Sequence, residues 1–75
     1  MIIRKGTTSE EIGVNNIEEL KNLCEKDDYY LVKHLWLTQN VATSQPKIVN
    51  INPENNSIGL EFYNEGTLTI TNLFN

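Results

Sequence analysis

The sequence predicts an α+β fold in which one main helix packs on a four- to five-stranded, mostly antiparallel sheet. Three observations support this prediction. Residues Lys47–Asn72 alternate apolar and polar side chains around two turn signals, which is typical of a C-terminal β-meander. Residues Ile17–Lys26 place apolar side chains at helical spacing, and Tyr29–Thr38 are rich in β-branched and aromatic residues. A chain of 75 residues fits one domain, 1–75, with a thin core.

The last two strands of the meander are predicted to form a hairpin. Asn64–Gly66 suits a three-residue loop, because its glycine can adopt the positive φ that such loops need. This loop would set Phe62 opposite Leu68 and Leu60 opposite Ile70, with all four side chains on one apolar face.

The first two strands of the meander are predicted to join through a turn at Pro53, whose fixed φ suits the second turn position. Pairing Ile51 with Ile58 would then bring Val49 opposite Leu60. The three strands would share the same apolar face.

The main helix is predicted to begin after Asn16, with Glu19 three residues later as in a capping box. Its apolar stripe consists of Ile17, Leu20, Leu23 and Cys24. A helix of this length would cover only part of the sheet.

The N-terminal residues give weaker signals. Met1–Lys5 suits a short strand added to one edge of the sheet. Thr8, with Glu11 three residues on and Gly13 beyond, suits the cap and end of a single helical turn.

Tyr29–Thr38 is predicted to be the longest strand. A helix is the competing interpretation, because Leu31 and Leu35 also lie four residues apart. As a strand, it would direct these leucines to the core and Tyr30 and Trp36 to the opposite face.

The net charge of −4 is unevenly distributed, because Ser9–Asp28 holds seven acidic residues against two lysines. The six basic residues are scattered and form no cationic patch of the kind on which nucleic-acid affinity depends. We therefore expect a neutral or basic protein partner and consider nucleic acid disfavoured.

The single Cys24 and the absence of a signal-like apolar run after Met1 predict a cytoplasmic protein without disulfides. No apolar segment approaches the roughly 20 residues that cross a bilayer, so we expect no membrane partner. Eleven asparagines, eight isoleucines and five lysines, against one alanine and one arginine, indicate A/T-rich codons. This composition suggests a phage or another mobile element of an AT-rich genome.

Catalytic chemistry has little support in the sequence. Cys24 and His34 are the residue types of a thiol nucleophile and its base, but Cys24 falls on the apolar stripe of the helix and suits core packing better. No phosphate-binding loop, dinucleotide fingerprint or zinc-ligand spacing occurs. We expect no enzyme activity, no cofactor and no metal.

A surface function remains. The sheet face opposite the helix is expected to hold Tyr30, Val32, His34, Trp36, Ile48, Tyr63 and the threonines at 67, 69 and 71. Its aromatic side chains are too many for a face that only meets solvent. Exposed Trp and Tyr are typical of protein interfaces. From this face we expect Tyr30, His34, Trp36 and Tyr63 to contact a partner, and from the helix Glu18 and Glu25.

The sequence thus favours a non-enzymatic protein-binding module, such as a small acidic inhibitor or accessory factor. One alternative is a structural subunit that forms homo-oligomers, for which the unprotected edge strand Thr67–Thr71 offers a pairing site. Another is single-stranded nucleic-acid binding, with bases stacked on the aromatic face.

Overall fold

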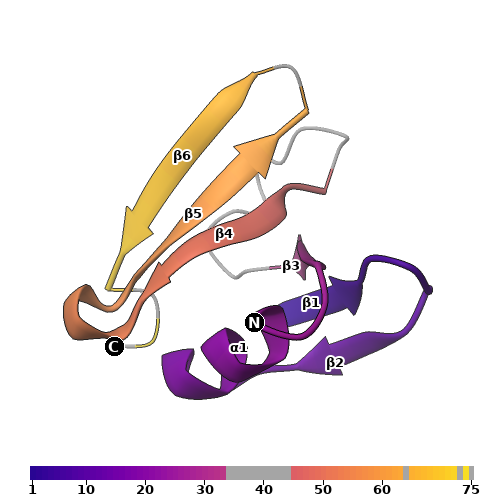
Figure 1. Cartoon of the computed structure of the whole chain (residues 1–75), viewed down its shortest axis with the longest axis horizontal. Coiled ribbons are helices and arrows are strands. Elements are labelled where there is room, and N and C mark those ends of the chain that lie inside the picture. The colour runs from indigo at the N-terminus through magenta and orange to yellow at the C-terminus, as the bar shows by residue number, and fades with distance from the viewer. Residues whose placement is uncertain (34–44, 64, 73, 75) are drawn as a thin grey trace.

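The computed structural model describes residues 1–33, 45–63, 65–72 and 74, and it forms an α+β fold with one helix on a six-stranded antiparallel sheet (Figure 1). The predicted class is confirmed, with a strand count slightly above the expected four to five. In chain order the elements are β1 (Ile2–Lys5), β2 (Glu11–Gly13), α1 (Ile17–Cys24), β3 (Tyr29–Lys33), β4 (Lys47–Asn52), the 3-10 helix η1 (Pro53–Asn55), β5 (Ser57–Phe62) and β6 (Gly66–Thr71).

The strand order is β2-β1-β3-β4-β5-β6, so the N-terminal strand β1 lies inside the sheet. The prediction that this strand is added to an edge was therefore wrong. β1 pairs with β2 on one side and with β3 on the other, and Ile3 lies opposite both Ile12 and Leu31. Because it has neighbours on both sides, Ile3 is fully buried.

The predicted helical turn after Thr8 is instead a tight turn that leads into β2. The Thr8 hydroxyl accepts a hydrogen bond from the backbone N–H of Glu10 at 3.1 Å, two residues on. This local bond closes a turn rather than capping a helix. The following residues, Glu11–Gly13, pair with β1, so sheet hydrogen bonding overrides a weak local helix signal.

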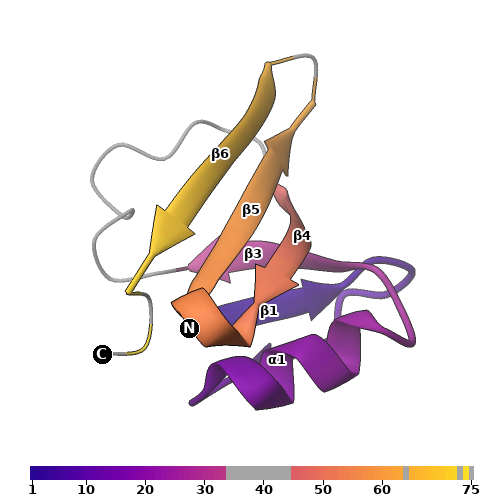
Figure 2. The same ribbon diagram turned by 60° about the vertical axis from the view of Figure 1, so that its left-hand side comes forward.

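The helix α1 begins where its cap predicted. The Asn16 side-chain oxygen accepts a hydrogen bond from the Glu19 N–H at 2.8 Å, which satisfies one of the otherwise unpaired amides of the first turn. Ile17 and Leu20 are buried, whereas Leu23 and Cys24 are partly buried. The helix contacts β4 and η1 and lies near one end of the sheet (Figure 2), so the far ends of β5 and β6 extend beyond it.

The described part of Tyr29–Thr38 is strand β3, which favours the strand interpretation for these five residues. Tyr29 and Leu31 are buried, and Tyr30 and Val32 are half-buried on the other side. The rest of the predicted strand, residues 34–38, lies outside the described residues.

The pairing of β4 with β5 differs from the prediction by one residue along part of its length. Near the turn, Asn52 lies opposite Ser57, in the predicted register. The register then shifts between Val49 and Asn52, and Asn50 adopts a left-handed backbone with φ of 52°. This β-bulge rotates the rest of the strand, because a one-residue slip exchanges the two faces.

As a consequence, Ile48 rather than Val49 lies opposite Leu60. Ile48 is buried in the core, so its predicted place on the face opposite the helix was wrong. Val49 is half-buried and lies opposite Gly59.

The hairpin of β5 and β6 forms one residue earlier than predicted, because β5 ends at Phe62 and Gly66 begins β6. Gly66 has the expected positive φ of 92°. The pairing is displaced by two residues, since Phe62 lies opposite Gly66 and Leu60 opposite Leu68. A two-residue shift preserves the faces, so the predicted apolar face was right although its individual pairs were wrong.

The core lies between α1 and one face of the sheet. Its fully buried side chains come from both halves of the chain: Ile3, Val14, Leu20, Ile58 and Leu60. The opposite sheet face carries the row of residues described below.

Candidate functional site

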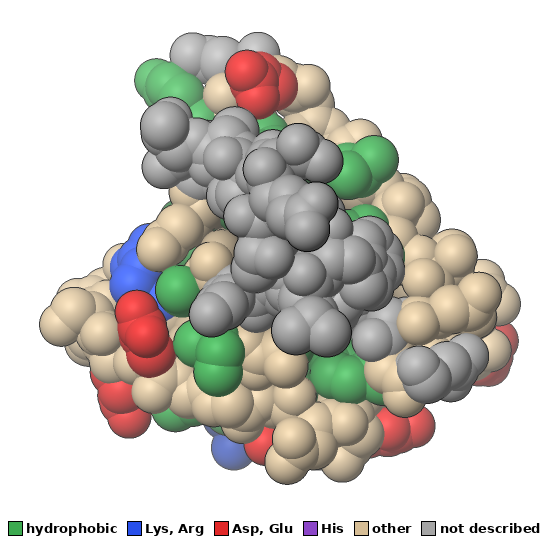
Figure 3. Space-filling model, turned by 180° about the vertical axis from the view of Figure 1, so that it is seen from behind, with side chains coloured by type: hydrophobic (Ala, Val, Ile, Leu, Met, Phe, Trp, Pro, Cys, Tyr) green, Lys and Arg blue, Asp and Glu red, His purple; other side chains and the backbone are tan. Residues whose placement is uncertain are grey.

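The acidic segment Ser9–Asp28 forms much of the surface around β2 and α1. All seven acidic side chains are exposed: Glu10, Glu11, Glu18, Glu19, Glu25, Asp27 and Asp28. In a view from behind, acidic groups also lie near the outline of the molecule, and the visible hydrophobic groups form separate patches (Figure 3).

The three acids at the end of the segment form ion pairs with lysines. Glu25 lies 3.4 Å from the Lys21 amine one helical turn earlier. Asp27 lies 3.5 Å from Lys5, and Asp28 lies 3.5 Å from Lys47. These exposed pairs add little stability, but they neutralise most of the local negative charge.

The four acids at the start of the segment form no ion pair with the described residues. Glu10 and Glu11 lie at β2, and Glu18 and Glu19 lie in the first turn of α1. The two helix residues predicted to bind a partner therefore differ. Glu18 is an exposed carboxylate with no ion pair to the part of the chain that the structure describes, whereas Glu25 is held by Lys21.

A row of directly paired residues crosses the sheet face opposite the helix. From edge to edge it consists of Glu11, Arg4, Tyr30, Lys47, Glu61 and Thr67. Its middle is basic and aromatic, and its two ends are acidic or polar.

Arg4 covers the predicted contact residue Tyr30. Its guanidinium carbon lies 4.8 Å from the centre of the Tyr30 ring, within cation–π distance. The guanidinium is also held by hydrogen bonds from Nε to Gln45 Oε1 at 2.8 Å and from Nη1 to the Thr8 carbonyl at 3.2 Å. One face of the Tyr30 ring is thus occupied within the chain.

Of the other predicted aromatic contacts, only Tyr63 lies among the described residues, and it is not part of this row. Tyr63 lies in the loop between β5 and β6, where it is 83% exposed. His34 and Trp36 lie outside the described residues. The sequence did not predict that Arg4 and Lys47 lie on this face beside Tyr30. Their positions depend on the order of the strands in the sheet, whereas the sequence pattern shows only which residues of each strand are apolar.

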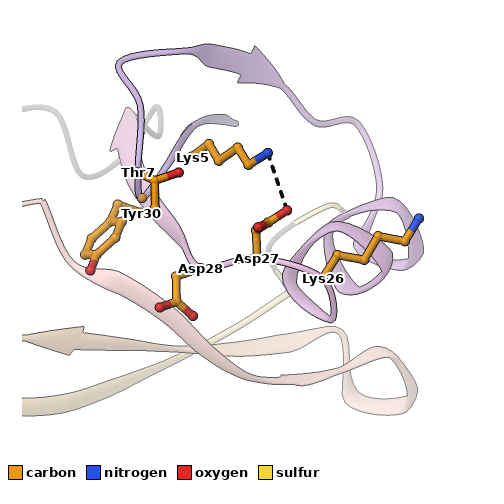
Figure 4. Close-up of a pocket in the computed structure, with 7 residues that line it drawn as sticks. Lys5, Thr7, Lys26, Asp27, Asp28 and Tyr30 are labelled. Atoms are coloured by element: carbon orange, nitrogen blue, oxygen red, sulfur yellow. Dashed lines mark ion pairs between the residues drawn. The ribbon is translucent and has the colours of Figure 1, made fainter.

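A depression of about 330 Å³ opens beside the end of β1 (Figure 4). Among its lining residues, Lys5 and Asp27 point toward each other, and Lys26 points away from them. Asp28 and Tyr30 line another part of the wall. Because Lys5 and Asp28 are each paired with an opposite charge, the depression offers no concentrated charge of one sign to a small ligand.

A second depression of about 340 Å³ lies between the end of α1 and β4, and Cys24 lines it. Burial, followed by the nearby Asp28 carboxylate, raises the pKa of the Cys24 thiol to about 11. The thiol is therefore protonated near neutral pH, and a protonated thiol is a poor nucleophile. Cys24 acts here as a half-buried apolar side chain.

Comparison of the chain with protein-family models, curated proteins and solved structures found no match. Among the described residues, no group of three or more His, Cys, Asp or Glu side chains could hold a metal ion. The helix in this part of the chain is too short and too polar to cross a membrane.

Proposed function

We propose that this chain is a non-enzymatic protein-binding module that captures a neutral or basic partner through the acidic surface of β2 and the first turn of α1. The observation that carries the proposal is the division of the acidic segment into paired and unpaired halves. Four exposed carboxylates at Glu10, Glu11, Glu18 and Glu19 lack an ion pair with the described residues.

Unpaired surface charge acts mainly on the approach of a partner. A patch of one sign steers a complementary surface during encounter and raises the association rate, and this effect weakens as salt screens it. The carboxylates of Glu18 and Glu19 also interact favourably with the positive end of the helix dipole, so part of their role is to stabilise α1. A test must therefore separate binding from helix stability.

The exposed loop between β5 and β6 gives further support to the proposal that the partner is a protein. Tyr63 is the most exposed large side chain among the described hydrophobic residues, and an exposed tyrosine is a common anchor of protein interfaces. His34 and Trp36 remain predicted contacts. A small inhibitor or accessory factor is the form of binding module that best fits an acidic chain of 75 residues.

Single-stranded nucleic-acid binding receives less support. Arg4 occupies one face of Tyr30, which removes a stacking surface, and Glu61 adds a negative charge to the same row. We therefore retain protein binding as the proposal.

The first test replaces Glu18 and Glu19 together by glutamine. The tagged chain is used to capture a partner from an extract of its native host, and the affinity of the purified pair is then measured at several salt concentrations. We expect the double variant to lower affinity roughly 2- to 30-fold, from about 0.2–1 kcal/mol for each exposed charge pair. The salt dependence should fall with it.

A matched control replaces Glu54 and Glu65, which are also exposed, by glutamine and changes the net charge equally. Circular dichroism of both double variants verifies that α1 is retained. An equal loss of affinity in the two double variants would mean that the partner responds to the net charge of the chain and not to the position of the acidic residues. If the variant with both Glu18→Gln and Glu19→Gln bound the partner as tightly as the unmodified chain, the acidic surface would not be the binding site.

A further inference from the structure

The strand β6 forms one edge of the sheet and is unusually open to pairing. Within the described part of the chain it pairs with β5 on one side and has no strand on the other. Its six residues, Gly66–Thr71, contain neither proline nor charge, and only Ile70 among them is buried. Every second residue of such an edge directs its N–H and C=O groups away from the sheet, toward a strand that could bind there.

Leu68 marks the place on β6 where the core is incomplete. It is 49% exposed, although its direct neighbour Leu60 on β5 is fully buried. Two residues further along, Ile70 lies opposite Ile58 and is buried. The helix lies near the Ile70 end of the strand and does not reach the hairpin end (Figure 2), which leaves Leu68 as an exposed continuation of the apolar face.

We propose that β6 pairs with β6 of a second copy of this chain, antiparallel and about a two-fold axis at Leu68. Directly opposed residues in an antiparallel sheet share a face, and a two-fold axis perpendicular to the sheet preserves faces. One residue of β6 must then lie directly opposite the same residue of the second copy, and the two-fold axis passes between the two. With Leu68 at the axis, Thr67 of each copy lies opposite Thr69 of the other, so apolar meets apolar and threonine meets threonine.

The chemistry of β6 selects a second copy over a strand of a basic partner. The edge has no carboxylate to pair with a lysine or arginine of a basic strand, whereas its sequence is complementary to itself. Threonine pairs and β-branched neighbours are favourable across antiparallel strands. This inference is independent of the proposed capture of a basic protein, which uses the other end of the sheet.

The strength and salt dependence of this pairing follow from its size and charge. Two six-residue strands bury less surface than the roughly 1,200 Å² of a standard stable interface, so the dimer should be weak. Each copy carries a net charge of −4, and the copies repel each other. Added salt should therefore strengthen dimerisation by screening this repulsion, whereas it weakens the binding of a basic partner.

Sedimentation equilibrium of the purified full chain tests the proposal. We expect the dimer fraction to rise with concentration and to be larger in high than in low NaCl. Leu68→Lys should weaken dimerisation by at least roughly tenfold, because it places two like charges opposite each other at the axis. The control Asn22→Lys adds the same charge on the exposed face of α1 and should leave the dimer unweakened.

Cross-linking locates the axis. In a Cys24→Ser background, Leu68→Cys should form a covalent dimer under mild oxidation faster than Tyr63→Cys. Exposure alone predicts the reverse order, since Tyr63 is 83% exposed and Leu68 49%.

Three results would overturn the proposal: a chain that is monomeric at every concentration in both salts, an equal effect of Leu68→Lys and Asn22→Lys, or faster cross-linking at position 63. A monomeric chain that loses a captured partner on Leu68→Lys would assign β6 to a strand of that partner instead. The capture proposal is judged separately, by the Glu18 and Glu19 variants.

Discussion

The two edges of the sheet, β2 and β6, differ in length, charge and exposure. β2 has three residues, and its Glu11 adds a charge to the edge. β6 has six residues and no charge, and Leu68 lies half-exposed within it. Short and charged edge strands resist the addition of further strands, whereas long uncharged ones permit it. Among the described residues, one sheet thus combines a protected edge beside the acidic surface with an edge that has no paired strand.

The two edge regions also differ in the space around one glycine in each. Next to β6, Gly59 lies so close to neighbouring strands that an added Cβ would meet Val49 Cγ2 at 3.0 Å and Thr67 Cγ2 at 3.3 Å. In β2, an added Cβ at Gly13 would find only Ile2 Cδ1, at 3.9 Å. Gly59, in the strand behind β6, is therefore closely packed, whereas Gly13, at the end of the edge strand β2, has room for a side chain.

The largest effect is expected from a pair of leucines on the β6 side. Leu60→Ala should lower the free energy of unfolding by about 2–5 kcal/mol, because it leaves a cavity at a fully buried position. Leu68→Ala, directly opposite, should cost less than about 1 kcal/mol in the monomer, because that side chain is half-exposed. Urea unfolding at low protein concentration measures both. Similar losses in the two variants would show that β6 is covered in solution.

The next largest effect is expected from substitution of the two glycines. Gly59→Ala should destabilise the fold by about 1–3 kcal/mol, since the new methyl group crowds Val49 and Thr67. Gly13→Ala should be neutral or stabilising by up to about 1 kcal/mol, because its Cβ makes only an ordinary van der Waals contact with Ile2 and the added side chain restricts the unfolded chain. Thermal unfolding compares them. A larger loss of stability from Gly13→Ala than from Gly59→Ala would contradict the difference in packing between these two positions.

The smallest effect is expected beside β2. Asn16→Ala removes the side-chain cap of α1 and should cost about 1 kcal/mol, because the Glu19 N–H loses its 2.8 Å hydrogen bond. The neighbouring Asn15 is exposed and is not the capping residue, so Asn15→Ala serves as the control. Helix content by circular dichroism, followed through urea unfolding, provides the measurement. Equal stability of the two variants would mean that the cap is not needed once β2 and α1 have packed.

Local signals predicted the elements that depend on local chemistry. The Asn16 cap and the positive φ of Gly66 each rest on one or two residues, and both were found as predicted. The chain also turns at Pro53, as predicted, although it does so as a short 3-10 helix. The bulge at Asn50 was not predicted, because an asparagine in a strand pattern does not reveal that its backbone is left-handed. That single conformation decides whether Ile48 or Val49 enters the core.

The position of β1 and the existence of β2 depend on pairing between distant segments. β1 reaches β3 across more than twenty intervening residues, and no local pattern specifies that neighbour. The same limit applies to the candidate surfaces. The exposed acids could be read from the sequence, but the ion pairs of Asp27 with Lys5 and of Asp28 with Lys47 join segments that only the fold brings together.

The asparagines of the β4–β6 region have a consequence for the unfolded chain. Asn50, Asn56 and Asn72 all adopt left-handed backbone conformations, with φ of 52°, 51° and 57°. Glycine reaches this conformation most easily, but it loses more conformational entropy on folding than any other residue. Asparagine tolerates the left-handed region better than most side chains while leaving the unfolded chain less free. An asparagine-rich composition thus gives a small domain its bends with less entropy to lose on folding.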